Sequence, residues 1–182
     1  MSAICIAPII SKSKYRGVDR FINFSDIKVK DNKVIKELGA MYLDYIDFDC
    51  NYDNSKNVCC YVRDILPFYL KLKENNVDCE IIIYDNIAVT DTYGYTLKFL
   101  GIDVANEFSE SLISDNVKYN SFTENSYLPL NDNLLFNNVS SAKSFIEMCK
   151  NSDKKEYFKT YLNTDDCTEK NLIKYVYMVV IG

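Results

Sequence analysis

The densest group of reactive side chains lies between residues 44 and 53, in the stretch DYIDFDCNYD. Four aspartates are interleaved there with aromatic residues, and no Lys or Arg occurs between Lys36 and Lys56. Aspartates at this density can ligate a cation, act as a paired acid and base, form the wet face of a strand, or attract a basic partner. The spacing of the aspartates decides which of these four uses remain open.

A calcium loop is the first use that the spacing excludes. The stretch begins like one, with the pattern D-x-D-x-N at Asp47, Asp49 and Asn51. Such a loop needs Gly at its sixth position, for a sharp turn, and a bidentate Glu at its twelfth. Tyr52 and Val58 occupy these positions. We therefore expect no metal ion here, and the sequence indicates no cofactor elsewhere.

Paired-carboxylate catalysis is the second excluded use. From Ile46 onward apolar and polar residues alternate with period two, which predicts a strand with one apolar and one acidic face. Asp47 and Asp49 would then be neighbours on one flat face, about 7 Å apart, and could not flank a substrate from opposite sides. The chain contains no histidine, which removes Ser–His and Cys–His nucleophilic pairs. A solvated strand face and a partner-binding acidic surface both remain open.

Charge is unevenly spread along the chain. The net charge is −5, yet residues 1–36 carry eight Lys or Arg against three Asp, so the remainder carries −10. Residues 76–117 hold eight acidic residues against the single base Lys98. This distribution argues against nucleic-acid binding, which needs a basic footprint, and favours a basic protein partner. Solubility alone is the alternative explanation of the acidity.

Composition indicates one cytoplasmic domain spanning residues 1–182. No segment resembles a targeting signal, and no apolar run approaches the roughly 20 residues that cross a bilayer. The seven cysteines are odd in number and include no C-x-x-C pair, so we expect them to be reduced. The absence of histidine lowers the expectation of an enzyme.

Hydrophobic patterning predicts an α+β fold, with a mostly antiparallel sheet packed against several helices. Residues 4–10 are expected to form a short strand or a buried terminus. Further strands are expected at residues 46–53, 57–62, 79–89, 93–105 and 171–181, with a bulge at Gly101. Helices are expected from Asp31 to Tyr45, with Asp31 or Asn32 as the cap, from Asp64 to about Asn75, from Ser140 or Ser141 to Cys149, and from 152 to 162. A single helix over 57–75 competes with the strand at 57–62. Residues 106–125 are expected to form a polar loop, and 134–136 a short strand or helix-entry turn.

The last half of the chain carries a series of short motifs. They are LGIDVAN at 100–106, SESLIS at 109–114, NDNLLF at 131–136, the helix SSAKSFIEMC at 140–149 and YVYMVVI at 175–181. This series resembles bacterial immunity proteins, the antidotes to contact-dependent growth inhibition and other polymorphic toxins. The chain departs from the usual pattern at Ile102, Asn106 and Leu134, where the family has Tyr, an acid and Gly.

The resemblance implies a cytoplasmic, non-enzymatic inhibitor that binds the C-terminal domain of its cognate toxin one-to-one and occludes the active site. Many such toxins are nucleases, whose clefts are basic because they bind phosphates. The ranked candidate contacts are Asp47, Asp49, Asp53, Tyr52, Tyr45, Asp85, Asp91, Glu107 and Glu110. Asp103 is interpreted as structural. The alternatives are a small carboxylate-based enzyme and an acidic interaction module.

Overall fold

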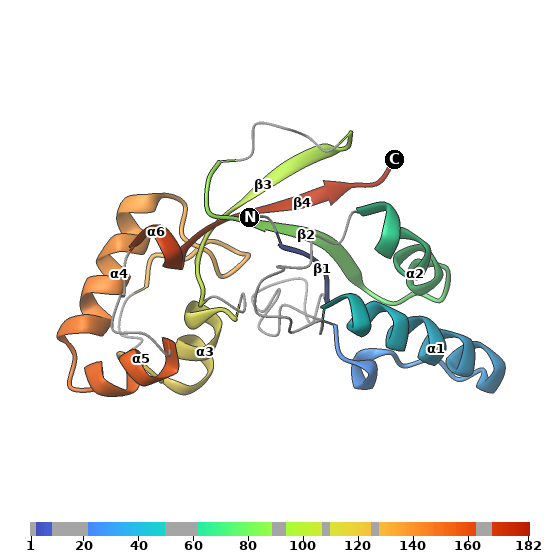
Figure 1. Cartoon of the computed structure of the whole chain (residues 1–182), viewed down its shortest axis with the longest axis horizontal. Helices are drawn as coiled ribbons and strands as arrows, with labels where there is room; N and C mark the ends of the chain where they lie inside the picture. Colours follow the sequence, from blue (N-terminus) through green and yellow to red (C-terminus); the bar gives the residue numbers. More distant parts are fainter. Residues whose placement is uncertain are drawn as a thin grey trace.

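The computed structural model describes residues 3–8, 22–49, 62–88, 94–106, 110–124, 128–162 and 169–182. Strands and helices both contribute, and the fold is α+β, as predicted (Figure 1). The strands are β1 (Ala3–Pro8), β2 (Cys79–Asp85), β3 (Thr96–Val104) and β4 (Ile173–Val180). The helices are η1 (Phe24–Asp26), α1 (Asn32–Asp49), α2 (Val62–Glu74), α3 (Leu112–Tyr119), α4 (Val139–Asn151), α5 (Lys155–Leu162) and α6 (Glu169–Leu172).

The four strands form one antiparallel sheet in the order β1-β2-β4-β3. The register places Ile83 of β2 opposite Tyr177 of β4, and Asp103 of β3 opposite Lys174 of β4. The C-terminal strand is thus central, and β3 is bonded to it along the whole of its length. This makes β4 the element on which the rest of the fold is assembled.

Both groups of helices cover the same face of the sheet. Along β4, Ile173 and Tyr175 pack into an apolar cluster with α3–α6, whereas Tyr177 and Val179 pack into another with α1 and α2. Alternate residues of a strand point to one face, so the two clusters share a face at opposite ends of β4. Figure 1 shows α1 and α2 at one end of the molecule and α3–α6 at the other. Val176 faces the other side, in a third cluster.

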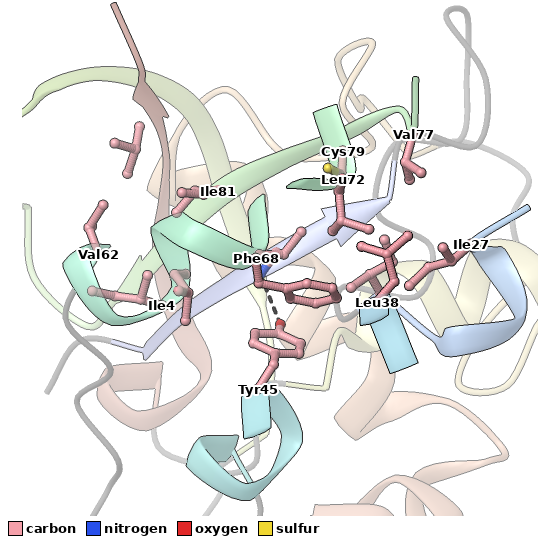
Figure 2. Close-up of a cluster of buried hydrophobic side chains, with 14 of the residues drawn as sticks. Ile4, Ile27, Leu38, Tyr45, Val62, Phe68, Leu72, Val77, Cys79 and Ile81 are labelled. Carbon is pink, nitrogen blue, oxygen red and sulfur yellow. Dashed lines mark hydrogen bonds between the residues drawn. The ribbon is translucent and has the colours of Figure 1, made fainter. Parts of the chain in front are cut away.

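Helix α1 begins and packs as its sequence pattern indicates. Asp31 caps it, because its Oδ1 accepts the backbone N–H groups of Lys33 and Val34 at 2.8 and 3.1 Å. Tyr45 lies on the buried side, with its ring centroid 5.5 Å from that of Phe68. Its hydroxyl accepts the N–H of Ile6 at 2.9 Å, which ties α1 to β1 (Figure 2).

The predicted strand at 46–53 is wrong where the structure describes it. Helix α1 continues through Asp49, so the backbone at 46–49 is helical, while 50–53 and the predicted partner at 57–61 lie outside the described residues. The period-two alternation competed with a helical spacing that already ran through Leu38 and Tyr45. Contact of Tyr45 with β1 and α2 favours continuation of the helix over a strand.

Three other expectations need comment. The polar stretch 106–125 contains α3, because Ser111 caps it and Leu112 and Ile113 are fully buried. Helix α4 begins slightly earlier than predicted, after the cap Asn138. Residues 134–136 form bridges rather than a strand: Phe136 pairs with Ile102 and with Leu130. The predicted elements at α2, β2, β3, α5 and β4 are confirmed, with shorter strands than expected.

Gly101 forms the predicted bulge in β3. The register with β4 shifts between Phe99 and Gly101, and Gly101 has φ +143°. A Cβ added there would lie 2.7 Å from Leu135 Cβ and 2.9 Å from the carbonyl oxygen of Phe136. The position therefore requires glycine both for its backbone conformation and for the close approach of the 131–136 turn.

Candidate functional site: an acidic tyrosine face and a buried lysine cluster

Two of the candidate contacts, Tyr45 and Asp85, are buried in the fold. Tyr45 is 4% exposed and is committed to Phe68 and the Ile6 N–H. Asp85 is 6% exposed at the end of β2. Neither can meet a partner without local unfolding, so both predictions are corrected. Each makes a hydrogen bond inside the fold: Tyr45 accepts the N–H of Ile6, and Asp85 accepts the N–H of Ile87.

The remaining candidates divide by position. Asp47 and Asp49 fall in the last turn of α1. Helical positions two apart are separated by about 200° around the axis, so these positions do not share one face as they would in a strand. Four more candidates lie outside the described residues: Tyr52, Asp53, Asp91 and Glu107. Glu110 is exposed and directly precedes the cap of α3.

Glu110 is fixed by hydrogen bonds on both its backbone and its side chain. Its N–H donates to Asn106 Oδ1 at 3.0 Å, and its Oε2 accepts from Asn106 Nδ2 at 2.8 Å. The next residue, Ser111, caps α3 by accepting the N–H of Ser114 at 3.1 Å. A carboxylate at this end of a helix is favoured by the helix dipole. Glu110 therefore presents its charge in a defined place.

Tyr161 of α5 lies beside Glu110, and Tyr157 of the same helix lies beside Tyr161, with 6.3 Å between their ring centroids. We call Glu110, Asp115, Tyr157 and Tyr161 the tyrosine face. The hydroxyl of Tyr161 donates to Glu110 Oε2 at 3.4 Å. Burial raises the pKa of Tyr161, and the negative charges of Glu110 and Asp115 raise it further. Both carboxylates thus act on the same phenol.

The Phe122 ring packs against both tyrosines. It is fully buried, and its ring lies 5.7 Å from Tyr157 in a stacked arrangement and 5.1 Å from Tyr161 edge-on. Asn116 fixes the backbone here, because its Oδ1 accepts the N–H groups of Phe122 and Thr123 at 3.0 and 2.9 Å. Tyr157 keeps 52% of its surface exposed. The face is therefore held rigidly while one aromatic ring remains open to contact.

The opposite end of α3 is basic. Lys118 Nζ lies 4.9 Å from the centroid of the Tyr119 ring, and Lys154 Nζ donates to the carbonyl of Asn120. Cations at the C-terminal end of a helix are favoured for the same reason as anions at its start. Within α3 itself, the acidic residue Asp115 therefore lies in the first turn and the basic residue Lys118 in the last.

A largely buried polar group is formed by Asp85, Asn86, Asp103 and Lys174, and we call it the lysine cluster. Lys174 is 9% exposed and Asp103 is fully buried. Lys174 Nζ donates to Asn86 Oδ1, and Asp103 Oδ1 accepts from Ser111 Oγ and from the Val104 N–H, each at 2.8 Å. Burial lowers the pKa of Lys174, while the charges of Asp85 and Asp103 oppose that shift.

Three of the motifs in the last half of the chain, at 100–106, 109–114 and 131–136, contact one another. Ile102 and Phe136 exchange backbone hydrogen bonds of 2.8 and 2.9 Å, and Asn131 Nδ2 donates to the carbonyl of Leu100 at 2.9 Å. Asp103 joins the first motif to Ser111 in the second. The motif residues therefore bind one another, as the interpretation of Asp103 as structural predicted.

Sequence reasoning missed Asp115, Tyr157, Tyr161 and Lys174. For Lys174 a signal was present, because one lysine interrupts the apolar run NLIKYVYMVVI. A lysine in a central strand has to be paired or lose its charge. For the tyrosines no sequence signal existed, since residues 110 and 161 are 51 positions apart and meet only in the folded chain.

Comparison with protein-family models, curated proteins and solved structures gives no match for this chain. Within the described ranges, no three or more Cys, Asp or Glu side chains are grouped so as to hold a metal ion. The helices of those ranges also include none with the length and apolar character needed to span a membrane.

Proposed function

We propose that this chain is an immunity protein, which binds the C-terminal domain of a cognate toxin and neutralises it one-to-one without catalysis. The observation that carries the proposal is the tyrosine face. Two carboxylates and an exposed tyrosine are held there by Asn106, Phe122 and the cap of α3. The resemblance of the 100–136 motifs to immunity proteins supports the same role.

The tyrosine face suits a basic protein surface. Complementary charge accelerates encounter, and buried Tyr side chains prolong the bound state. Aromatic faces also attract Lys and Arg directly. A nuclease cleft has this basic chemistry because it binds phosphates. In the proposed mechanism the chain covers such a cleft in the cytoplasm and excludes the nucleic acid.

Co-expression tests the proposal. It predicts a toxin gene directly upstream of the gene for this chain, and a stable complex with that toxin's C-terminal domain that rescues growth. Absence of both complex and rescue, with both proteins soluble, would overturn the proposal.

The tyrosine face is tested by removing its charge without changing its shape. Glu110→Gln and Asp115→Asn together keep the hydrogen-bonding atoms, and should slow association by about three- to tenfold at low ionic strength. The difference should shrink with added salt. Asp78→Asn is the matched control, because Asp78 is exposed and directly precedes Cys79, which packs into the apolar cluster with α1 and α2. Equal association rates for the double variant and the control would remove the tyrosine face from the interface.

A further inference from the structure

We infer that the outer side of α1 is a docking surface for a second copy of this chain, with the two α1 helices packed antiparallel. The inference does not depend on the proposed function, because it concerns two copies of this chain alone. The surface, which we call the α1 outer face, consists of Lys33, Lys36, Ala40, Leu43, Asp44 and the position of Asp47.

Helical spacing places these six positions along one side of α1, because residues three and four apart are neighbours on a helix surface. The five whose side chains the structure describes are all exposed. Leu38 and Tyr45 occupy the opposite side of the helix and are buried in the core. Figure 1 shows α1 at the margin of the molecule, beside α2. The α1 outer face is therefore accessible along most of the helix.

The middle of the α1 outer face is apolar. Leu43 is 59% exposed, and Ala40 lies three residues before it and is exposed as well. The distance between packed helices depends on the side chains at the contact, so a residue as small as Ala40 lets a second helix approach closely. Single exposed leucines are common and need no function. The charges on either side of Leu43 indicate what covers it.

These charges are separated by sign along the helix. Lys33 and Lys36 lie at its start, and Asp44 lies near its end with the position of Asp47. Glu37 is paired with Lys71 of α2 at 3.3 Å, whereas no described residue forms an ion pair with Lys33, Lys36 or Asp44. A second α1 packed antiparallel brings its acidic end to this basic start and its basic start to this acidic end. The α1 outer face is thus complementary in charge to its own copy.

The same charges oppose the dipole of α1. Anions are favoured at the start of a helix and cations at its end. Lys33 nevertheless lies in the first turn and Asp47 in the last, and α1 has no acidic residue in its first turn and no basic residue in its last. This placement costs stability in a lone helix. An antiparallel second copy offsets the cost, because it places opposite charges beside both ends.

Pairing through α1 leaves the tyrosine face uncovered, because α3 and α5 belong to the other group of helices (Figure 1). Each chain of such a dimer can still bind one toxin domain. The 18 residues of α1 span about 27 Å. A contact made by one helix pair is at the small end of protein interfaces, so we expect association in the micromolar range.

Sedimentation velocity of the purified chain at increasing concentration tests the pairing. The wild-type chain should pass from monomer to dimer in the micromolar range, and added salt should raise the dimer Kd. A wild-type chain that remains monomeric up to about 1 mM would overturn the inference. If this monomer still binds and inhibits the toxin, the proposed function stands.

Two charge-reversal variants test the antiparallel arrangement. Lys33→Glu with Lys36→Glu makes the α1 outer face acidic throughout, and Asp44→Lys with Asp47→Lys makes it basic throughout. Each variant alone should dimerise at least tenfold more weakly than the wild-type chain, whereas an equimolar mixture of the two should form a heterodimer. Both variants carry the charge that the helix dipole favours, so thermal unfolding of the monomers should not be lowered. A mixture that associates no better than its components would overturn the inference.

Leu43→Ala tests the apolar centre. It should raise the dimer Kd about three- to tenfold. Met148→Ala is the matched control, because Met148 is 40% exposed on α4, in the other group of helices, and should change Kd less than twofold. Equal Kd values for the two variants would overturn the placement of Leu43 at the centre of the interface.

Discussion

Asp103 is the residue on which the polar contacts of the fold converge. One of its oxygens accepts from Ser111 Oγ and the Val104 N–H, and the side chain lies opposite Lys174 in the β3–β4 register. Through these contacts it joins the sheet to the cap of α3 and to the turn at Asn86. A single buried carboxylate thus links the sheet to the N-terminal cap of α3, next to Glu110 in the chain.

Replacing Asp103 should be among the most damaging single changes. Asp103→Ala leaves Lys174 with less compensating charge and Ser111 without its acceptor, so we expect a loss of about 3–5 kcal/mol in the free energy of unfolding. Asp103→Asn should cost less, because the amide oxygen can still accept from Ser111. Urea unfolding measures both. A loss below about 1 kcal/mol for Asp103→Ala would contradict the role given to this residue.

Two buried thiols provide a second test at the residue scale. Burial raises the pKa of Cys79 and of Cys149 to about 12, from 9.0. The unfolded chain therefore releases these protons first, so the stability they contribute is complete below pH 9 and is lost as pH rises towards 12. Urea unfolding at pH 8, 9.5 and 10.5 should show falling stability. Flat stability over this range would contradict the assignment.

Labelling gives the matching chemical readout. Native protein treated with iodoacetamide at pH 8 should carry no label at Cys79 or Cys149, because the reactive thiolate is absent and both side chains are buried. Peptide mass spectrometry after unfolding serves as the positive control. Rapid labelling of either thiol in the native state would show that the surrounding helices open readily.

At the scale of elements, the sequence predicted what depends on local pattern and missed what depends on packing. The helix cap at Asp31, the strand β2 and the bulge at Gly101 all follow from local rules. Helix α3 was missed because polar residues dominate its stretch, and two of them, Ser114 and Asn116, are buried for structural reasons. The end of α1 was missed because two periodicities overlapped there.

For the candidate site too, the sequence predicted one charged residue but not the residues that packing brings next to it. Glu110 was predicted from charge alone and lies on the tyrosine face. Tyr161, which donates a hydrogen bond to Glu110, lies 51 residues later in the chain, on α5 with Tyr157. Tyr45 and Asp85 were predicted as contacts for their residue type, and are buried because each has a partner inside the fold.

The bulge in β3 gives a test with a matched control. Gly101→Ala introduces a Cβ at 2.7 Å from Leu135 Cβ at a backbone conformation with φ +143°, so both strain and a clash oppose it. We expect a loss of about 2 kcal/mol or more. Gly94→Ala shares the positive φ, at +77°, but meets nothing within 4 Å and should cost about 1 kcal/mol. Equal losses would show that the 131–136 turn does not constrain the bulge.

At the scale of the whole molecule, the acidic candidate contacts that the structure describes and leaves unburied fall in two places. One is the end of α1, with exposed Asp44 and the positions of Asp47 and Asp49. The other is the tyrosine face on α3 and α5. Figure 1 places these helices in the two separate groups on the sheet. A partner that contacts both would span the molecule, whereas a smaller interface would use only one.

Charge reversal at the end of α1 separates these cases. Asp47→Lys with Asp49→Lys should weaken toxin binding in a salt-sensitive way if this end of α1 lies within the interface. Association rates at two ionic strengths provide the measurement. Unchanged affinity and association rate would exclude this end of the molecule and leave the tyrosine face as the charged contact.

The most direct test of the proposed function is a titration of the toxin's activity. The purified C-terminal domain of the toxin encoded upstream is held at a concentration well above Kd, and this chain is added in steps. A stoichiometric inhibitor should lower the activity linearly and abolish it at one equivalent. Full activity at several equivalents, with the chain folded by circular dichroism, would contradict the assignment as an immunity protein.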